Sequence, residues 1–142
     1  MNIADIQKLH AQMVKTKFEL GTLASNIIDQ ESYDNLNVVK VVTKESLDNS
    51  QFPEAINFAR KLNDKPKNIY KHLGIYCYRL NTLEKFVSFN QSVNEIKYKL
   101  EQLRALDNEI KINVAFAESS PIGVDTKEDF VAIKKIMEYK SK

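Results

Sequence analysis

Apolar residues recur every three to four positions in several parts of the chain, and this spacing predicts amphipathic helices. The pattern is clearest over residues 3–15 and 94–106. A helix that starts at a proline is predicted over residues 53–62, because proline fits the first turn of a helix. Capping-box spacing predicts a short helix over residues 81–87 and a last helix over residues 126–137.

Four other stretches have the pattern of strands. Residues 110–116 alternate apolar and polar side chains, which is the period of a half-buried strand. Strands are also predicted over residues 18–28 and 69–79, and the β-branched run at 38–43 predicts a strand covered on both faces. Because helices and strands alternate along the chain, we expect an α/β fold with a mixed sheet and helices on its faces.

Two residues interrupt the predicted strands. Lys40 stands inside the β-branched run, so its ammonium must reach a sheet edge, an ion pair or a ligand. Gly21 marks either a bulge or a close approach of another segment to the backbone. We therefore expect a specific contact at each of the two positions, although the pattern does not identify the contacting group.

Composition and charge narrow the class of protein. The chain has 142 residues, 43% of them hydrophobic and 28% charged, which predicts one globular domain. The net charge of +2, with both signs interspersed, argues against nucleic acid or an anionic membrane as a partner. The single cysteine, Cys77, excludes an internal disulfide and a zinc cluster. No apolar stretch approaches the length of a membrane span, so we expect a cytoplasmic protein.

Residue patterns leave the chemistry open. The sequence has no glycine-rich phosphate loop, no metalloprotease histidine pair and no nucleophile elbow. His72 and Tyr76 lie four apart on one predicted strand and share a face, so they could bind a polyhydroxylated acid. A packed aromatic face with a buried histidine is the alternative interpretation of the same spacing.

The segment from residue 93 to 130 carries the remaining polar candidates, Glu101, Gln102, Arg104 and Asp125. Glu101 and Gln102 are interpreted either as site residues at the edge of the apolar stripe or as a solvated helix face. Asp125 precedes a predicted helix, where it is either a helix cap or a magnesium ligand.

Several segments together resemble one enzyme family. They are KHLGIYCYR at 71–79, LEQLRAL at 100–106, INVAFAESSPIGVDTKEDF at 112–130, NLNVVKVV at 35–42 and NFAR at 57–60. This combination resembles the 3-deoxy-manno-octulosonate cytidylyltransferases, also called CMP-Kdo synthetases. These enzymes join CTP to the eight-carbon sugar acid Kdo for lipopolysaccharide assembly.

The resemblance implies a Rossmann-like nucleotide-diphospho-sugar transferase fold and a defined reaction. The anomeric hydroxyl of Kdo attacks the α-phosphate of CTP, magnesium holds the phosphates, and pyrophosphate leaves. By resemblance, the residues that line the Kdo pocket are Arg60, His72, Tyr76, Glu101 and Gln102, and the magnesium ligand is Asp125.

Part of the family's sequence has no counterpart here. The family begins with a strand and a basic loop that binds the CTP phosphates, and it carries a second metal-binding aspartate ahead of the matched region. We therefore expect residues 1–142 to form a single domain, similar to the C-terminal sugar-binding and dimerisation part, with the N-terminal nucleotide-binding part missing. We also expect an exposed apolar patch near residues 38–42 or 20–28, where the missing strands leave the sheet uncovered.

Two functional hypotheses follow from this resemblance. In the first, the chain is part of a cytidylyltransferase, is inactive alone and needs another polypeptide to bind CTP. In the second, it is a non-catalytic truncated remnant that acts as a ligand-binding or dimerisation module. A homodimer is expected under both hypotheses.

Overall fold

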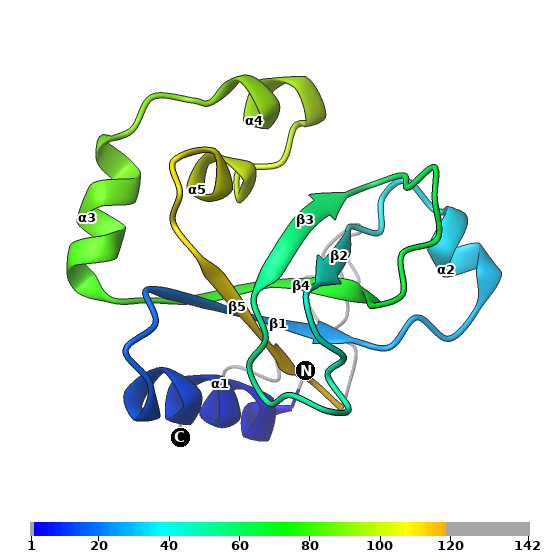
Figure 1. Cartoon of the computed structure of the whole chain (residues 1–142), viewed down its shortest axis with the longest axis horizontal. Coiled ribbons are helices and arrows are strands. Elements are labelled where there is room, and N and C mark those ends of the chain that lie inside the picture. Colours follow the sequence, from blue (N-terminus) through cyan, green and yellow to red (C-terminus); the bar gives the residue numbers. More distant parts are fainter. Residues whose placement is uncertain (1, 119–142) are drawn as a thin grey trace, which may run out of the picture.

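The computed structural model describes residues 2–118 and contains a mixed sheet with helices on its faces (Figure 1). The strands are β1 (Leu20–Ser25), β2 (Lys40–Thr43), β3 (Ala55–Ala59), β4 (Ile69–Tyr78) and β5 (Ile112–Phe116). The helices are α1 (Ile3–Lys15), α2 (Gln30–Asp34), α3 (Leu80–Ser88), α4 (Val93–Tyr98) and α5 (Leu103–Asp107). The strand order is β3-β2-β4-β1-β5, and β1 pairs with β5 in parallel while the other neighbours are antiparallel. The predicted α/β fold is therefore confirmed.

The sheet has an apolar core on each face. On one face, α1 packs Leu9 and Met13 in a cluster that also contains Leu73 of β4. On the other face, the larger cluster includes Phe86 of α3 and Leu103 of α5. Figure 1 shows the same division, with α1 on one side of the sheet and α3, α4 and α5 apart from α1. Burial of these side chains is the main term that holds the helices to the sheet.

The exposed apolar patch predicted near residues 38–42 or 20–28 is not found on β1 or β2, although Ile28, beyond the end of β1, is 89% exposed. Every residue of β1 and of β2 is buried, because each of these strands lies between two others and under helices or loops. The close approach predicted at Gly21 is confirmed. A Cβ atom there would lie 2.8 Å from Cζ of Phe52 and 2.9 Å from Cδ1 of Leu9.

Two local predictions need correction. Residues 53–62 do not form a helix, because β3 pairs with β2 and turns Phe58 into the core opposite Val41. A short helix that was not predicted, α2, begins after Asp29, whose carboxylate accepts a hydrogen bond from the Ser32 amide at 2.7 Å. Within the described residues, α3 begins after Arg79 with no side-chain cap, so the predicted capping box is wrong.

The helix predicted over residues 94–106 is divided in two. The backbone at Lys99 is left-handed, with φ of 56° and ψ of 45°, and this turn separates α4 from α5. As a result Ile96 is 60% exposed, although it shares the helical spacing of the buried Leu100 and Leu103. The predicted helix at 126–137 and Asp125 lie outside the described residues.

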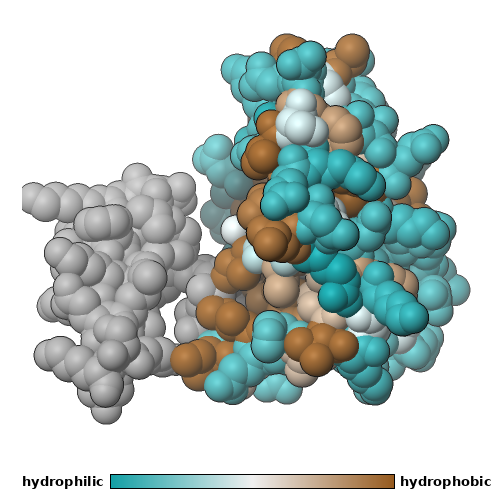
Figure 2. Space-filling model, turned by 90° about the vertical axis from the view of Figure 1, so that its left-hand side faces the viewer, coloured by the Kyte–Doolittle hydropathy of each residue, from teal (hydrophilic) through white to brown (hydrophobic). Residues whose placement is uncertain are grey.

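Apolar side chains also reach the surface. Figure 2 shows hydrophobic patches between polar residues on the side that carries α3, where Leu80 and Val87 are exposed. Within residues 2–118, no helix combines the length and the apolar character needed to cross a membrane.

Candidate functional site

The five residues predicted to bind the sugar acid line one cavity of about 550 Å³. Arg60 follows the end of β3, His72 and Tyr76 lie on β4, and the other two occupy the turn between α4 and α5. The remaining lining residues are Asn35, Asn37, Val38, Val39, Lys71, Leu73, Gly74, Lys99 and Leu100. The structure thus brings together the five predicted residues, which span 42 positions from Arg60 to Gln102, while their role as sugar ligands stays a prediction.

The aromatic face that was the alternative interpretation of β4 is also present. The rings of His72 and Tyr76 are 5.5 Å apart, and Phe58 meets the imidazole edge-on at 4.9 Å. Tyr78 continues the row at 6.0 Å from Tyr76. Because His72 and Tyr76 also line the cavity, the packed face and the cavity wall are the same surface.

His72 is a neutral imidazole whose tautomer is fixed by Thr22. Burial lowers the pKa of His72 to about 4, so the ring carries no charge near neutral pH. The Thr22 hydroxyl lies 2.6 Å from the carbonyl oxygen of Ile75 and 3.0 Å from Nε2 of His72. Since the hydroxyl donates its one proton to the carbonyl, Nε2 must donate to the hydroxyl. Nδ1 then carries no proton, so it is the ring nitrogen that can accept a hydrogen bond from a ligand hydroxyl.

Tyr76 supplies a hydrogen-bond donor. Burial, followed by the nearby Tyr78 and the Glu101 carboxylate, raises the pKa of the Tyr76 phenol above its ordinary value. The phenol therefore stays protonated at neutral pH. Together, His72 and Tyr76 present one acceptor and one donor, which suits a ligand with several hydroxyl groups.

Cationic side chains dominate the charge of the cavity. Arg60, Lys71 and Lys99 line it, and Glu101 is the single carboxylate among its described lining residues. The Arg60 guanidinium donates to the carbonyl oxygens of Leu36 at 3.2 Å and of Lys99 at 3.3 Å. Arg60 therefore connects two walls of the cavity and adds charge that favours an anionic ligand.

Arg104, the other polar candidate of this segment, has a different role. Its guanidinium donates to the two carboxylate oxygens of Glu95 at 2.8 and 2.6 Å, and it lies 4.8 Å from the Phe86 ring centroid. The hydrogen bonds from Arg104 are the main cause that lowers the pKa of Glu95. Because Glu95 belongs to α4 and Arg104 to α5, this pair holds the two helices together across the turn at Lys99.

Pattern reasoning missed Thr22 and did not connect Lys40 to the cavity. Thr22 gives no signal in sequence, because a threonine in an apolar strand is ordinary and its role depends on β4 opposite it. Lys40 gave a signal, a charge inside a β-branched run, and the structure shows its ammonium bonded to backbone carbonyls.

The described residues do not test the magnesium prediction, which stays a prediction. The predicted ligand Asp125 lies outside residues 2–118, and these described residues contain no group of three or more His, Cys, Asp or Glu side chains that could hold a metal.

One side of β4 near the cavity is only partly paired with the other described strands. β1 pairs with β4 from Lys71 to Tyr78, whereas β2 pairs with the opposite edge of β4 only from Ile69 to Lys71. Among the described strands none pairs with that edge from Gly74 onward. Gly74, in this open stretch, also lines the cavity.

The comparisons with known proteins agree on one family. A family model described as cytidylyltransferase matches residues 2–112. The 3-deoxy-manno-octulosonate cytidylyltransferase of Bartonella tribocorum is 41% identical over 122 residues, which are 84% of this chain and 49% of that protein. The protein of the same name from Paramagnetospirillum magneticum is 38% identical over 87% of this chain and 50% of its own length.

A solved structure shows the same likeness in three dimensions. It is a CMP:2-keto-3-deoxy-manno-octonic acid synthetase complexed with CTP, and it matches with a TM-score of 0.78 and 26% sequence identity. The match covers 99% of this chain and 58% of that one. The chain thus spans about half the length of the curated relatives it matches.

Proposed function

The chain belongs to the cytidylyltransferase family, and from this we propose that it forms the sugar-acid side of a site that transfers CMP from CTP to Kdo. One observation carries the proposal. The residues that the resemblance implies as Kdo ligands come from three separate parts of the fold, the end of β3, β4 and the α4–α5 turn, and line one cavity. The proposal places the reaction in lipopolysaccharide biosynthesis.

The cavity offers groups that match a carboxylated polyol. Arg60, with the ammonium groups of Lys71 and Lys99 nearby, would bind the carboxylate of the sugar acid. The neutral His72 would accept a hydrogen bond from a sugar hydroxyl through Nδ1, and the protonated Tyr76 would donate one. These residues orient the sugar so that its anomeric oxygen can attack the α-phosphorus of CTP.

In the proposed reaction, a bond forms between the anomeric oxygen and the α-phosphorus, and the bond from that phosphorus to pyrophosphate breaks. The anomeric hydroxyl releases its proton to the solvent, and pyrophosphate carries away the negative charge of the broken bond. Magnesium, with Asp125 as its predicted ligand, belongs to the same proposal.

The nucleotide side of the site is proposed to come from a second part. The chain spans about half of its relatives, and 42% of the solved relative lies outside the match that covers 58% of it. The open edge of β4 from Gly74 onward borders the cavity and offers a place where a further strand could pair. We therefore expect this chain alone to bind Kdo without releasing pyrophosphate, and we keep a homodimer as part of the proposal.

Calorimetric titration of Kdo into the purified chain tests the sugar side. Tyr76→Phe removes a hydroxyl from the cavity wall, whereas Tyr78→Phe removes one from the next position on the same face of β4, outside the lining. The loss of one neutral hydrogen bond should weaken binding about fivefold in Tyr76→Phe and leave Tyr78→Phe unchanged. Equal effects of the two substitutions, or no binding of Kdo by the parent chain, would contradict the proposal.

Pyrophosphate release from CTP, Kdo and magnesium tests the rest. The chain alone should be inactive, and addition of a polypeptide carrying the remaining part of a cytidylyltransferase should produce activity. Asp125→Asn should then abolish that activity. Activity of the chain alone would refute the need for a second part, and full activity of Asp125→Asn would refute the metal assignment.

A further inference from the structure

We infer that Lys40 is a positioning residue for the cavity, because its buried ammonium ties together the backbone of two of the cavity walls. One wall is the turn that contains Asn35, and the other is the end of β3 at Arg60. The tether itself stands on contacts in the unliganded chain. Its effect on sugar-acid binding rests on the proposed function.

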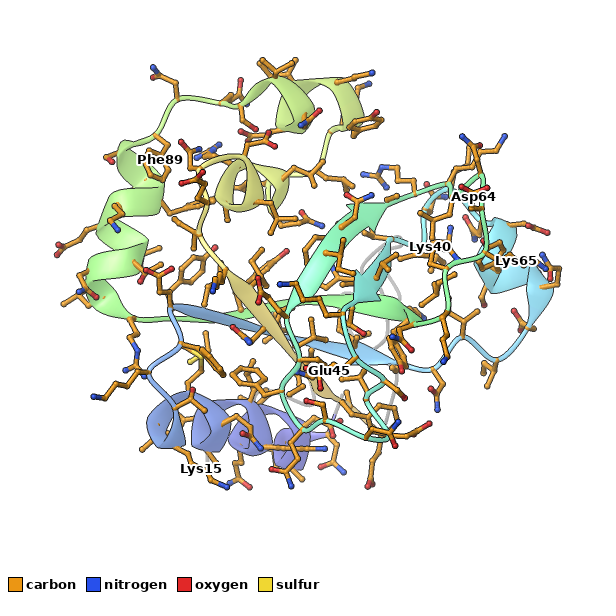
Figure 3. The ribbon with its side chains drawn as sticks, viewed as in Figure 1. Lys15, Lys40, Glu45, Asp64, Lys65 and Phe89 are labelled. Carbon is orange, nitrogen blue, oxygen red and sulfur yellow. The ribbon has the colours of Figure 1, made fainter. Side chains whose placement is uncertain are left out.

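The contacts of Lys40 are specific. Lys40 begins β2, is 1% exposed and is among the largest fully buried side chains of the described residues. Its Nζ donates to the carbonyl oxygen of Asn35 at 2.8 Å and also to the carbonyl oxygen of Arg60. Figure 3 shows Lys40 beside β2, between the sheet and the segment that carries α2. Both acceptors are backbone atoms of residues that line the cavity, so the ammonium fixes main chain rather than side chains.

A buried lysine at this position lowers the stability of the fold unless its ammonium forms hydrogen bonds that offset the loss of water. Burial removes the ammonium from water and lowers the pKa of Lys40, while Asp34 nearby acts in the opposite direction. The following residues of the strand, Val41 and Val42, are apolar and buried, so the charge of Lys40 is an exception in this part of β2. The two carbonyl bonds compensate the burial only in the geometry that brings Asn35 and Arg60 close together.

The tether extends to the third wall through Arg60. While Lys40 holds the Arg60 backbone, the Arg60 guanidinium donates to Leu36 beside Asn35 and to Lys99 in the α4–α5 turn. Three segments that are distant in sequence therefore meet at a single buried ammonium and one guanidinium. Loss of the ammonium should leave the Arg60 backbone, and with it the guanidinium, free to move away from the ligand carboxylate.

Lys40→Met, with Lys44→Met as the matched control, tests this inference. Lys44 follows the same strand but forms an exposed ion pair with Glu54 away from the cavity lining. In Lys40→Met, amide hydrogen exchange of residues 35–39 and 60–64 should become about tenfold faster, with β1 and β5 unchanged. The dissociation constant for Kdo should rise about tenfold. Lys44→Met should match the parent chain in both measurements.

Two further variants separate positioning from general stability. Lys40→Arg keeps a charged donor and should restore both exchange protection and affinity to within about threefold of the parent chain. Arg60→Met should weaken Kdo binding but keep residues 60–64 protected, because the Lys40 bond to the backbone carbonyl oxygen of residue 60 remains.

Each outcome decides the inference. Uniformly faster exchange throughout Lys40→Met would make Lys40 a general stability residue and overturn the assignment. If Lys40→Met does not fold, Lys40→Arg and Arg60→Met decide the assignment, and loss of protection at residues 60–64 in Arg60→Met would refute it. If the parent chain does not bind Kdo, the proposed function fails, while the exchange result still decides the tether.

Discussion

The hydroxyl of Thr22 on β1 lies 3.0 Å from Nε2 of His72 on β4, and both side chains are buried. The same hydroxyl is bonded to backbone carbonyl oxygens, so it can only accept from the imidazole. This contact determines which nitrogen of His72 carries the proton, and therefore which one can accept a hydrogen bond from a ligand.

Thr22→Val should remove this control. The buried Nε2 proton of His72 then loses its acceptor, which should lower the free energy of unfolding by about 1–3 kcal/mol. Nitrogen NMR of the imidazole should show a change in the tautomer mixture. Thr43→Val is the control, because it removes another buried hydroxyl, bonded to the Glu45 carbonyl oxygen at 2.6 Å, that is not bonded to His72. A change of the His72 signals in both variants would contradict the assigned tautomer.

The stability of the chain should fall with acid in a window set by His72. Its pKa is about 4 in the folded chain, below the ordinary value of 6.5, so the unfolded state takes up a proton first. The neutral state of His72 contributes fully to the free energy of unfolding above pH 6.5. This contribution, about 3 kcal/mol, is lost as the pH falls from 6.5 to about 4. Urea unfolding at a series of pH values measures it. His72→Gln should flatten the dependence in this window, whereas a similar flattening in His10→Gln would place the effect elsewhere.

The sequence predicted several elements from their own residues. The helix α1 and the strands β4 and β5 follow from side-chain periodicity, and β2 follows from its β-branched run. β3 was missed because the spacing of Ala55 and Ala59 also fits a helix. The pairing of Phe58 with Val41 of β2 decides its structure, and that contact is not visible in a local pattern.

The site could be predicted only in part from residue patterns. Spacing alone joined His72 to Tyr76, because they share one strand, but it favoured a solvated helix face for Glu101 and Gln102. The resemblance to a family supplied the rest. The left-handed turn at Lys99 explains the difference, since it carries Glu101 and Gln102 out of a continuous helix and toward β4.

The pair between Glu95 and Arg104 should contribute to stability more than an exposed ion pair does. The two side chains are only 6% and 14% exposed, and the guanidinium makes two hydrogen bonds to the carboxylate. Arg104→Met should lower the free energy of unfolding by about 2 kcal/mol, because Glu95 is left without its partner. Lys44→Met breaks an ion pair whose lysine side chain is 56% exposed and should cost less than about 0.5 kcal/mol. Equal costs in urea unfolding would show that Glu95 finds another partner.

Lys99→Gly should separate the effect of backbone strain on stability from the effect of the Lys99 charge on ligand binding. Lys99 and Glu109 are the two described non-glycine residues with positive φ, 56° and 62°, and glycine adopts this conformation without steric cost. Lys99→Gly and Glu109→Gly should therefore each raise the free energy of unfolding by about 0.5–1 kcal/mol, after the entropy cost of glycine in the unfolded chain.

The two variants should differ in ligand binding. Lys99 lines the cavity and Glu109 does not, so Lys99→Gly alone removes a positive charge from the proposed carboxylate site. Its dissociation constant for Kdo should rise about threefold, while Glu109→Gly keeps the affinity of the parent chain. Thermal unfolding and titration of the same samples measure both effects. If Lys99→Gly gained stability without losing affinity, the Lys99 charge would have no part in binding. Arg60 and Lys71 would then be the cations that bind the Kdo carboxylate.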